Sequence, residues 1–274
     1  MKDDSHMRPM TSAVIATDEV ARLARQAVAV LAAHGPGRSD GMARRLLQMS
    51  DTFISPDEAL RHEMLLRLRQ DGITNEDLVD HVIPAVARLM GERWGADDIS
   101  FAHVTIGAAR LQETVRAIGR RHDAEDAKAI LLVVPRTEHH TLGSFVLADQ
   151  WRRRGFAVDI AVDRHPRQLV EVLRKRRYHM VGITASGRRT LASVRELVDI
   201  IHSTATRVTP VIIGGPILDK DIDVRALTGA DHTARDAASA LMKCGLLQAG
   251  RIAPSFKNIS HAGDGVPVVR VRGS

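Results

Sequence analysis

The chain has 274 residues, of which 44% are hydrophobic and 26% are charged, a composition typical of a soluble globular protein with ample material for a core. Its 39 basic and 33 acidic residues give a net charge of +6. The single cysteine, Cys244, excludes an intrachain disulfide and fits a reducing cytoplasm, and no apolar run approaches the ~20 residues that a membrane-spanning helix needs.

The N-terminal part of the sequence predicts a helix and a linker. Residues 12–33 place apolar side chains at helical spacing. Residues 34–39 contain glycine, proline and serine, which are typical of a connecting segment. We therefore expect residues 1–54 to form an N-terminal helix and linker.

The next part, residues 55–125, predicts a helical bundle. Ser55 is predicted to cap its first helix, with Pro56 in the first turn. A second helix is predicted to begin at residues 74–77, and Ser100 is predicted to cap a third. The apolar positions that recur at helical spacing in these two helices are Leu78, Val82, Val86, Met90, Val104, Ala108, Leu111 and Val115.

From residue 126 the pattern changes to alternating strands and helices. Strands are predicted at residues 129–135, 157–163, 180–185 and 210–214, with a short fifth near 230–232. Helices are predicted at residues 144–154, 166–177, 190–204 and 233–248. This alternation predicts an α/β fold, in which a Rossmann-like parallel sheet with helices on both faces occupies residues 126–250 and a mobile polar tail occupies residues 251–274.

Three runs of basic residues stand out in this half of the chain, at residues 152–154, 174–177 and 188–189. One interpretation is a phosphate-binding surface for nucleic acid. The first two runs also end predicted helices, where basic side chains complement the helix dipole, and we favour this second interpretation. Because the sequence shows no helix-turn-helix signature, direct DNA contact ranks low among the expected interactions.

The loop after the first predicted strand carries a metal-binding pattern. Residues 138–143 read E-x-H-x-x-G, and loops at the carboxyl ends of parallel strands are where α/β proteins bind ligands. His140 can ligate a metal through one ring nitrogen while Glu138 accepts a hydrogen bond from the other. Gly143 lets a bulky flat group approach the backbone. The alternative interpretation is a solvated loop, in which His139 and His140 are surface residues.

Two later strand ends and one aromatic residue support a ligand at this edge. Small hydroxyl residues, Thr184 and Ser186, lie at the end of the third strand, and the pair Gly214 and Gly215 lies at the end of the fourth. Hydroxyls suit hydrogen bonding to a ligand, and glycines permit close backbone approach, although turns also favour both. Trp94 lies in a predicted connecting segment, where it could be exposed to cap a ligand or be part of the bundle core.

A helical bundle followed by E-x-H-x-x-G, Thr184-x-Ser186 and Gly214-Gly215 resembles the cobalamin-binding module of methionine synthase and of related corrinoid proteins and photoreceptors. The pattern of that family reads D-x-H-x-x-G, S-x-L and G-G, and the resemblance covers about residues 55–248. It implies a cobalamin-binding fold in which His140 ligates cobalt and Glu138 orients it, with His139 and Gly143 also at the cofactor. Thr184, Gly214 and Gly215 would line the slot for the nucleotide tail of the cofactor, and Ser186 would make this slot roomier.

The bundle segment of residues 91–107 resembles the AerR/PpaA antirepressors of photosynthetic proteobacteria. Adenosyl-binding photoreceptors carry W-x9-E-H here, whereas this chain has Val104 and Thr105 in place of the Glu-His pair and His103 one residue early. The resemblance implies that this segment covers the upper face of the cofactor. The residues it assigns to that role are Trp94, Phe101, His103 and Val104.

These resemblances imply a cobalamin-binding, light-responsive regulator of photosynthesis genes rather than an enzyme. The antirepressors act on a redox-responsive transcriptional repressor of CrtJ/PpsR type, which is therefore the expected partner. One alternative is a corrinoid methyl carrier of a methyltransferase system, which shares the fold. A second is a haem-binding sensor, because an axial histidine also suits iron.

Overall fold

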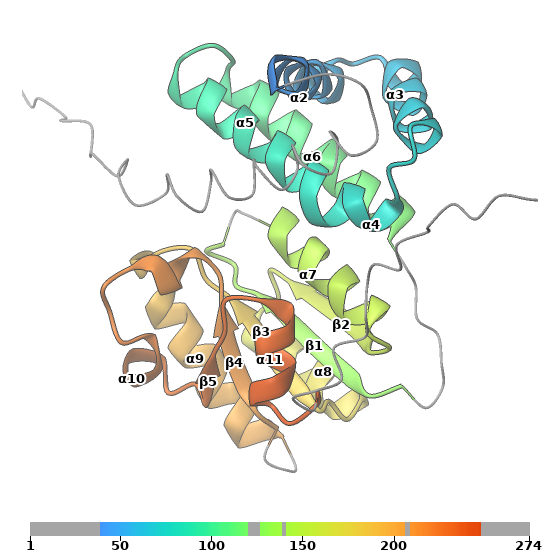
Figure 1. Cartoon of the computed structure of the whole chain (residues 1–274). Coiled ribbons are helices and arrows are strands. Elements are labelled where there is room, and N and C mark those ends of the chain that lie inside the picture. Colours follow the sequence, from blue (N-terminus) through green and yellow to red (C-terminus); the bar gives the residue numbers. More distant parts are fainter. Residues whose placement is uncertain (1–38, 120–126, 139–140, 206–208, 248–274) are drawn as a thin grey trace, which may run out of the picture.

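The computed structural model describes residues 39–119, 127–138, 141–205 and 209–247. The predicted helix over residues 12–33 and the predicted tail from residue 251 lie outside these ranges. The described chain forms a helical bundle above an α/β domain (Figure 1). Among its helices, none combines the length and apolar character required to span a membrane.

The bundle is built from helices whose starts are set by local capping. Thr74 accepts a hydrogen bond from the backbone of Asp77, and Ser100 accepts one from the backbone of His103, so both predicted starts are confirmed. The predicted cap Ser55 is wrong, because Asp57 accepts from the first turn instead. The elements are α2 (Ser39–Ile54), α3 (Glu58–Gln70), α4 (Asn75–Asp77), the π-helical turn η1 (Leu78–Val82), α5 (Ile83–Gly95) and α6 (Phe101–Ile118).

Helices α2, α5 and α6 pack around one apolar core. The predicted apolar positions of η1 and α5 are confirmed, since Leu78, Val82, Val86 and Met90 are all buried. Gly107 of α6 lies against Met90, where an added Cβ would come within 2.6 Å of the sulfur. Met49 and Phe53 of α2 are also buried in this core, so the packed helical region extends back before residue 55.

The α/β domain contains a parallel sheet of five strands in the order β2-β1-β3-β4-β5. All five predicted strands are confirmed. The first reads as a continuous apolar run because both of its faces are buried, as is usual in parallel sheets. The strands are β1 (Ala129–Val134), β2 (Ala157–Val162), β3 (Met180–Thr184), β4 (Val211–Gly214) and β5 (His232–Thr233).

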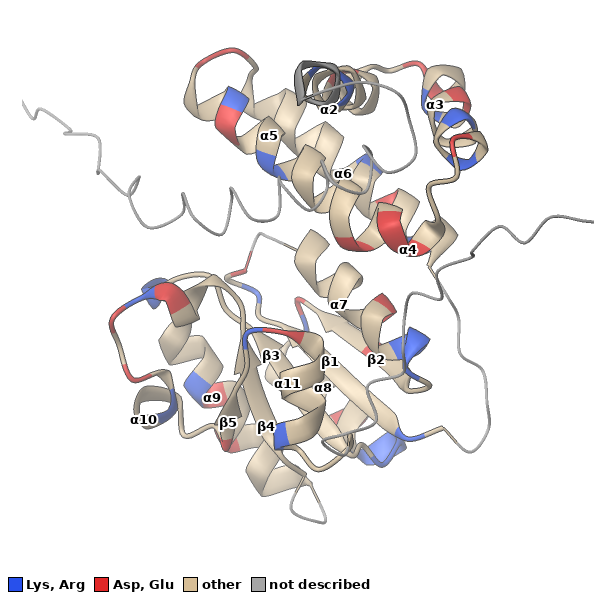
Figure 2. Ribbon diagram, viewed as in Figure 1, with Lys and Arg blue, Asp and Glu red and all other residues tan. Residues whose placement is uncertain are grey.

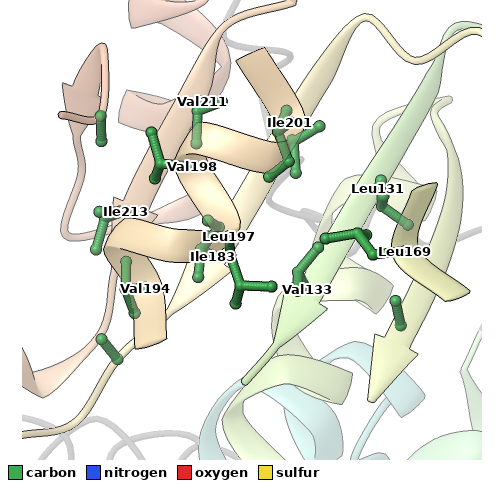
Figure 3. Packing of buried hydrophobic residues seen from close by; sticks show 14 of the residues in the cluster. Leu131, Val133, Leu169, Ile183, Val194, Leu197, Val198, Ile201, Val211 and Ile213 are labelled. Carbon is green, nitrogen blue, oxygen red and sulfur yellow. The ribbon is translucent and has the colours of Figure 1, made fainter. Parts of the chain in front are cut away.

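Helices cover both faces of the sheet, as predicted. On one face, Leu131 and Val133 of β1 pack with Leu169 and with side chains of α9 such as Val194 (Figure 3). On the other face, the alternate β1 side chains pack with Trp151 and with α11. The helices of this domain are α7 (Leu142–Arg153), α8 (Pro166–Lys175), α9 (Leu191–Thr204), α10 (Val224–Thr228) and α11 (Ala237–Lys243).

The C-terminal helices differ from the prediction in two respects. The expected helix over residues 233–248 begins only at Ala237, because Asp236 caps it and the preceding residues form β5. The short helix α10 was not predicted, and its signal was Asp223 as the cap with Gly229 in a left-handed conformation (φ 73°) at its end. Burial raises the pKa of Cys244, just after α11, to about 11, so its thiol is a poor nucleophile at neutral pH.

Helix α7 joins the two parts of the molecule. Its Phe145 and Val146 are buried in the bundle core, and the guanidinium of Arg116 lies 4.3 Å from the centre of the Phe145 ring. At its far end, Arg153 Nη2 lies 2.5 Å from Asp80 Oδ1 of the π-helical turn. The bundle is therefore held over one face of α7, beside the carboxyl edge of the sheet.

Candidate functional site

The strand order places a ligand site at one edge of the sheet. In the sheet, β2 lies on one side of β1, whereas β3, β4 and β5 follow one another on the other side. Loops after strands that diverge in this way leave a crevice at the carboxyl edge, where open α/β sheets bind ligands. The loops after β1, β3 and β4 all end at this edge.

A cavity of about 360 Å³ opens there, between α7 and the start of α11. Its volume lies within the range of roughly 300–1,000 Å³ that is usual for small-molecule pockets. Six of the residues predicted from the sequence line it, namely Glu138, Gly143, Thr184, Ser186, Gly214 and Gly215. Three segments that are distant in the sequence therefore meet as expected.

The cavity also borders two residues that were not predicted, Trp151 and Gly182. The Trp151 indole is 1% exposed, and its Nε1–H donates to the carbonyl of Ala237 at 3.1 Å. An added Cβ on Gly182 would lie 2.9 Å from this ring, so the glycine leaves the room that the indole needs against β3. The scarcity of tryptophan in the sequence could have drawn attention to Trp151. Its contact with Gly182 could not be predicted, because the two residues lie on different elements, α7 and β3.

The two glycines at the end of β4 lie close to neighbouring backbone, and the fold itself requires the second, Gly215. Gly215 has a φ of 106°, and an added Cβ would lie 2.6 Å from the carbonyl oxygen of Ala185. A Cβ on Gly214 would lie 3.0 Å from the carbonyl oxygen of Ala234. Gly143 is different, because no atom lies within 4 Å of where its Cβ would be. Open space at Gly143 is the feature that a bound group would use.

Polar groups line the part of the cavity next to α7. Ser144 is 2% exposed, and its hydroxyl donates to the Thr184 hydroxyl at 3.5 Å. Glu138 is 6% exposed, and its backbone N–H donates to the carbonyl of Pro135. These groups can hydrogen-bond a ligand, while most of the remaining wall is apolar.

A second carboxylate borders the cavity at the start of α11. Burial alone would raise the pKa of Asp236, but hydrogen bonds from the side chain and backbone of Ser239 outweigh it and lower the pKa below its usual value. Asp236 is therefore ionised at neutral pH and already used as a helix cap.

The predicted metal ligand and its neighbour, His140 and His139, both lie outside the described residues. Their assigned roles stay predictions from the sequence. Across residues 39–119, 127–138, 141–205 and 209–247, no cluster of three or more His, Cys, Asp or Glu side chains could hold a metal ion.

The four candidates from the bundle do not line the cavity. Trp94 lies in the last turn of α5 rather than in a connecting segment, because the helix runs on to Gly95. It is 47% exposed, and its ring centre lies 5.7 Å from that of Phe101, which is 66% exposed. His103 caps α6, with Nδ1 accepting from the backbone of Ser100, and Val104 packs against the bundle core.

Comparison with known proteins agrees with this architecture. A family model described as B12 binding domain matches residues 128–242. A relative from Rhodobacter capsulatus, described as an uncharacterized 20.5 kDa protein in the bchF-crtJ intergenic region, is 32% identical over 177 residues, which are 63% of this chain and 92% of that protein. The monomethylamine corrinoid protein of Methanosarcina barkeri superposes with a TM-score of 0.55 at 19% identity, covering 73% of this chain and 95% of that one.

Proposed function

This chain belongs to the B12-binding domain family, and from this premise we propose that it is a cobalamin-binding transcriptional regulator that relieves repression by a repressor of CrtJ/PpsR type. The observation that carries the cofactor is the cavity at the carboxyl edge, with open space at Gly143. The regulatory part is supported by the relative named for its place beside crtJ. The single Cys244 fits action in the cytoplasm.

The described residues fit a large ligand with one flat part. The cavity is mostly apolar, includes the buried hydroxyl of Ser144 and the half-buried hydroxyl of Thr184, and borders the Trp151 indole. We propose that His140 supplies the nitrogen ligand to cobalt. Glu138 is buried and precedes His140 by two residues, and we propose that it orients the imidazole. Cobalamin supplies a cobalt–carbon bond that visible light breaks.

Gly143→Leu tests whether the open space at this residue is occupied by the cofactor. Stability should stay unchanged or rise slightly, because no atom lies within 4 Å of the new Cβ and leucine favours a helix by up to ~1 kcal/mol over glycine. Cobalamin affinity should fall by about tenfold or more, since 1.4 kcal/mol of steric conflict already corresponds to a factor of ten. Equilibrium dialysis and urea unfolding measure the two quantities.

The matched control is Gly143→Ala, which adds one methyl group and should weaken binding less. Equal cobalamin affinity in the wild type and in Gly143→Leu would mean that the cofactor does not use this space. A parallel loss of stability would point to a role in packing instead.

Helix α7 supports a link between the cofactor and the bundle. It contributes Gly143 and Ser144 to the cavity, and Phe145 and Val146 to the bundle core. A structural change in the loop before α7 would therefore affect both the cavity and the bundle core, because α7 contributes side chains to each. We propose that light or cofactor state alters the packing of the bundle and thereby the surface that meets the repressor.

Repressor release in the dark and in the light tests the regulatory proposal. Holoprotein added to the repressor on its operator fragment should release the fragment to a different extent in the two conditions. Cobalamin-free protein is the control and should show no difference. Identical release from holoprotein in dark and light would contradict the switch, and no release at all would contradict the antirepressor role.

Catalysis is the competing function. A corrinoid methyl carrier uses the same fold, but the likeness to the monomethylamine corrinoid protein, at 19% identity, shows the fold alone. We propose a regulator rather than an enzyme, and methyl transfer from methylcobalamin-loaded protein to an acceptor would favour the carrier. Haem, the other cofactor considered, has no support from these relatives.

A further inference from the structure

Two basic helix ends lie at the amino edge of the sheet, opposite the cavity. Each of α7 and α8 returns from the carboxyl edge so that the next parallel strand can start. Helix α7 ends at Arg153 just before β2, and α8 ends at Lys175 just before β3. The basic runs at residues 152–154 and 174–177 are therefore brought to the same edge.

Each of the two runs has a side chain that contacts the edge strand β2. Arg152 Nη2 donates to the carbonyl of Val158 at 2.7 Å, and Arg176 Nη1 lies 3.1 Å from Asp159 Oδ2. Helices α7 and α8 belong to opposite faces of the sheet. The two runs thus flank consecutive residues of β2 from both sides, and Figure 2 shows the blue ends of the two helices.

Three of these cations are available to a partner. Arg174, Lys175 and Arg177 are exposed, and within the described chain their side chains form no ion pair or hydrogen bond. Arg153 and Arg176 differ, because Asp80 and Asp149 neutralise the first and Asp159 pairs with the second. The helix dipole accounts for one or two cations in a last turn, but it does not account for Arg177, which lies beyond the helix.

We propose that this surface, defined by Lys128, Arg152, Arg154, Arg174, Lys175, Arg176 and Arg177, binds the phosphate backbone of duplex DNA. The amino ends of β2 and β3 lie two strand spacings apart, about 10 Å, so the two runs contact different phosphates. Arginine forks match phosphate oxygens, and such contacts position a protein on DNA without reading sequence. A helix-turn-helix is therefore not needed.

The composition of the surface favours duplex DNA over other polyanions. Single strands are held by exposed aromatic rings, yet Phe156 and Tyr178, the aromatics near this edge, are buried. Membrane-surface helices insert exposed apolar side chains. Among the described residues, the exposed large hydrophobic side chains lie on the bundle, α10 and α11, and none lies on α7, α8 or the strand starts.

DNA binding at this surface does not depend on the proposed function, because the cavity lies at the other edge of the sheet. A regulator that binds its cofactor at the carboxyl edge of the sheet and DNA at the amino edge could contact a repressor that is bound to a nearby operator. The sites can be filled at the same time.

Fluorescence anisotropy of a labelled duplex of arbitrary sequence, with cobalamin-loaded protein, tests the proposal. Affinity should fall steeply between about 50 and 200 mM salt. The variant Arg174→Glu/Lys175→Glu/Arg177→Glu should bind at least tenfold more weakly. The slope of log K against log salt should flatten by about 0.9 for each phosphate that the variant no longer neutralises. Arg177→Glu alone should flatten this slope by about 0.9, the value for a single phosphate.

The matched control Arg69→Glu/Lys220→Glu/Arg225→Glu makes the same change in net charge at exposed residues elsewhere and should retain most of the affinity. Equal loss in both triple variants, or no binding by the wild type, would overturn the proposal. So would binding to phosphatidylserine vesicles without binding to duplex. Cobalamin uptake by each variant reports folding, and its failure in the wild type would count against the proposed function only.

Discussion

Replacing Gly215 by alanine is expected to lower the free energy of unfolding by about 2–4 kcal/mol. A non-glycine residue at a φ of 106° carries strain on the order of 1–3 kcal/mol. The new Cβ would also lie 2.6 Å from the Ala185 carbonyl oxygen, at the end of a buried strand. Relief requires the loop to shift, and overpacking of this kind costs about 1–3 kcal/mol. Urea unfolding followed by circular dichroism measures the change.

Gly187→Ala is the control for this prediction. Gly187 lies in the neighbouring loop after β3 with a φ of −151°, and no atom lies within 4 Å of its added Cβ. Its unfolding free energy should stay within about 0.5 kcal/mol of the wild type. Similar stability of the two variants would show that the turn at Gly215 tolerates a side chain and that its glycine serves another purpose.

His140→Ala is expected to abolish histidine coordination of cobalt and to weaken cobalamin binding by about 100-fold or more. Loss of a residue that merely orients a metal ligand costs about 10–100-fold in affinity, so loss of the ligand itself costs at least as much. The visible absorption spectrum of reconstituted protein should lose the signature of a coordinated histidine. Equilibrium dialysis gives the affinity.

The adjacent His139→Ala is the matched control and should keep the wild-type spectrum. Glu138→Gln should fall between the two, because it preserves shape while it removes the charge that strengthens the hydrogen bond to the imidazole. An unchanged spectrum in His140→Ala would remove this residue from its predicted role. Loss in His139→Ala alone would assign the role to the neighbour.

Local patterns were sufficient to predict most of the fold. A strand buried on both faces must read as an unbroken apolar run, and β1 does so from Ala129 to Val134. One error, at the start of α3, came from competition between two neighbouring residues that both suit a helix cap. Ser55 and Asp57 both suit a helix cap, and only the packed chain determines that Asp57 takes the role.

The site could be predicted only where it depends on strand ends. Parallel strands bring Thr184 and Gly214 to one edge whatever the details of packing, so these residues were found. The base of the cavity depends on packing between a helix and a strand, as between Trp151 and Gly182, and the spacing of residues in the sequence does not encode it.

The sharing of α7 has a consequence for how such proteins diversify. Phe145 and Val146 complete the hydrophobic core of the bundle although they belong to a helix of the sheet domain. Separating the bundle from the sheet domain would expose Phe145 and Val146 on the sheet domain and would leave the bundle core without them. Recombination that brings in a different helical cap must therefore exchange the facing residues of α7 as well, so caps and sheets in this architecture are constrained to evolve as matched pairs.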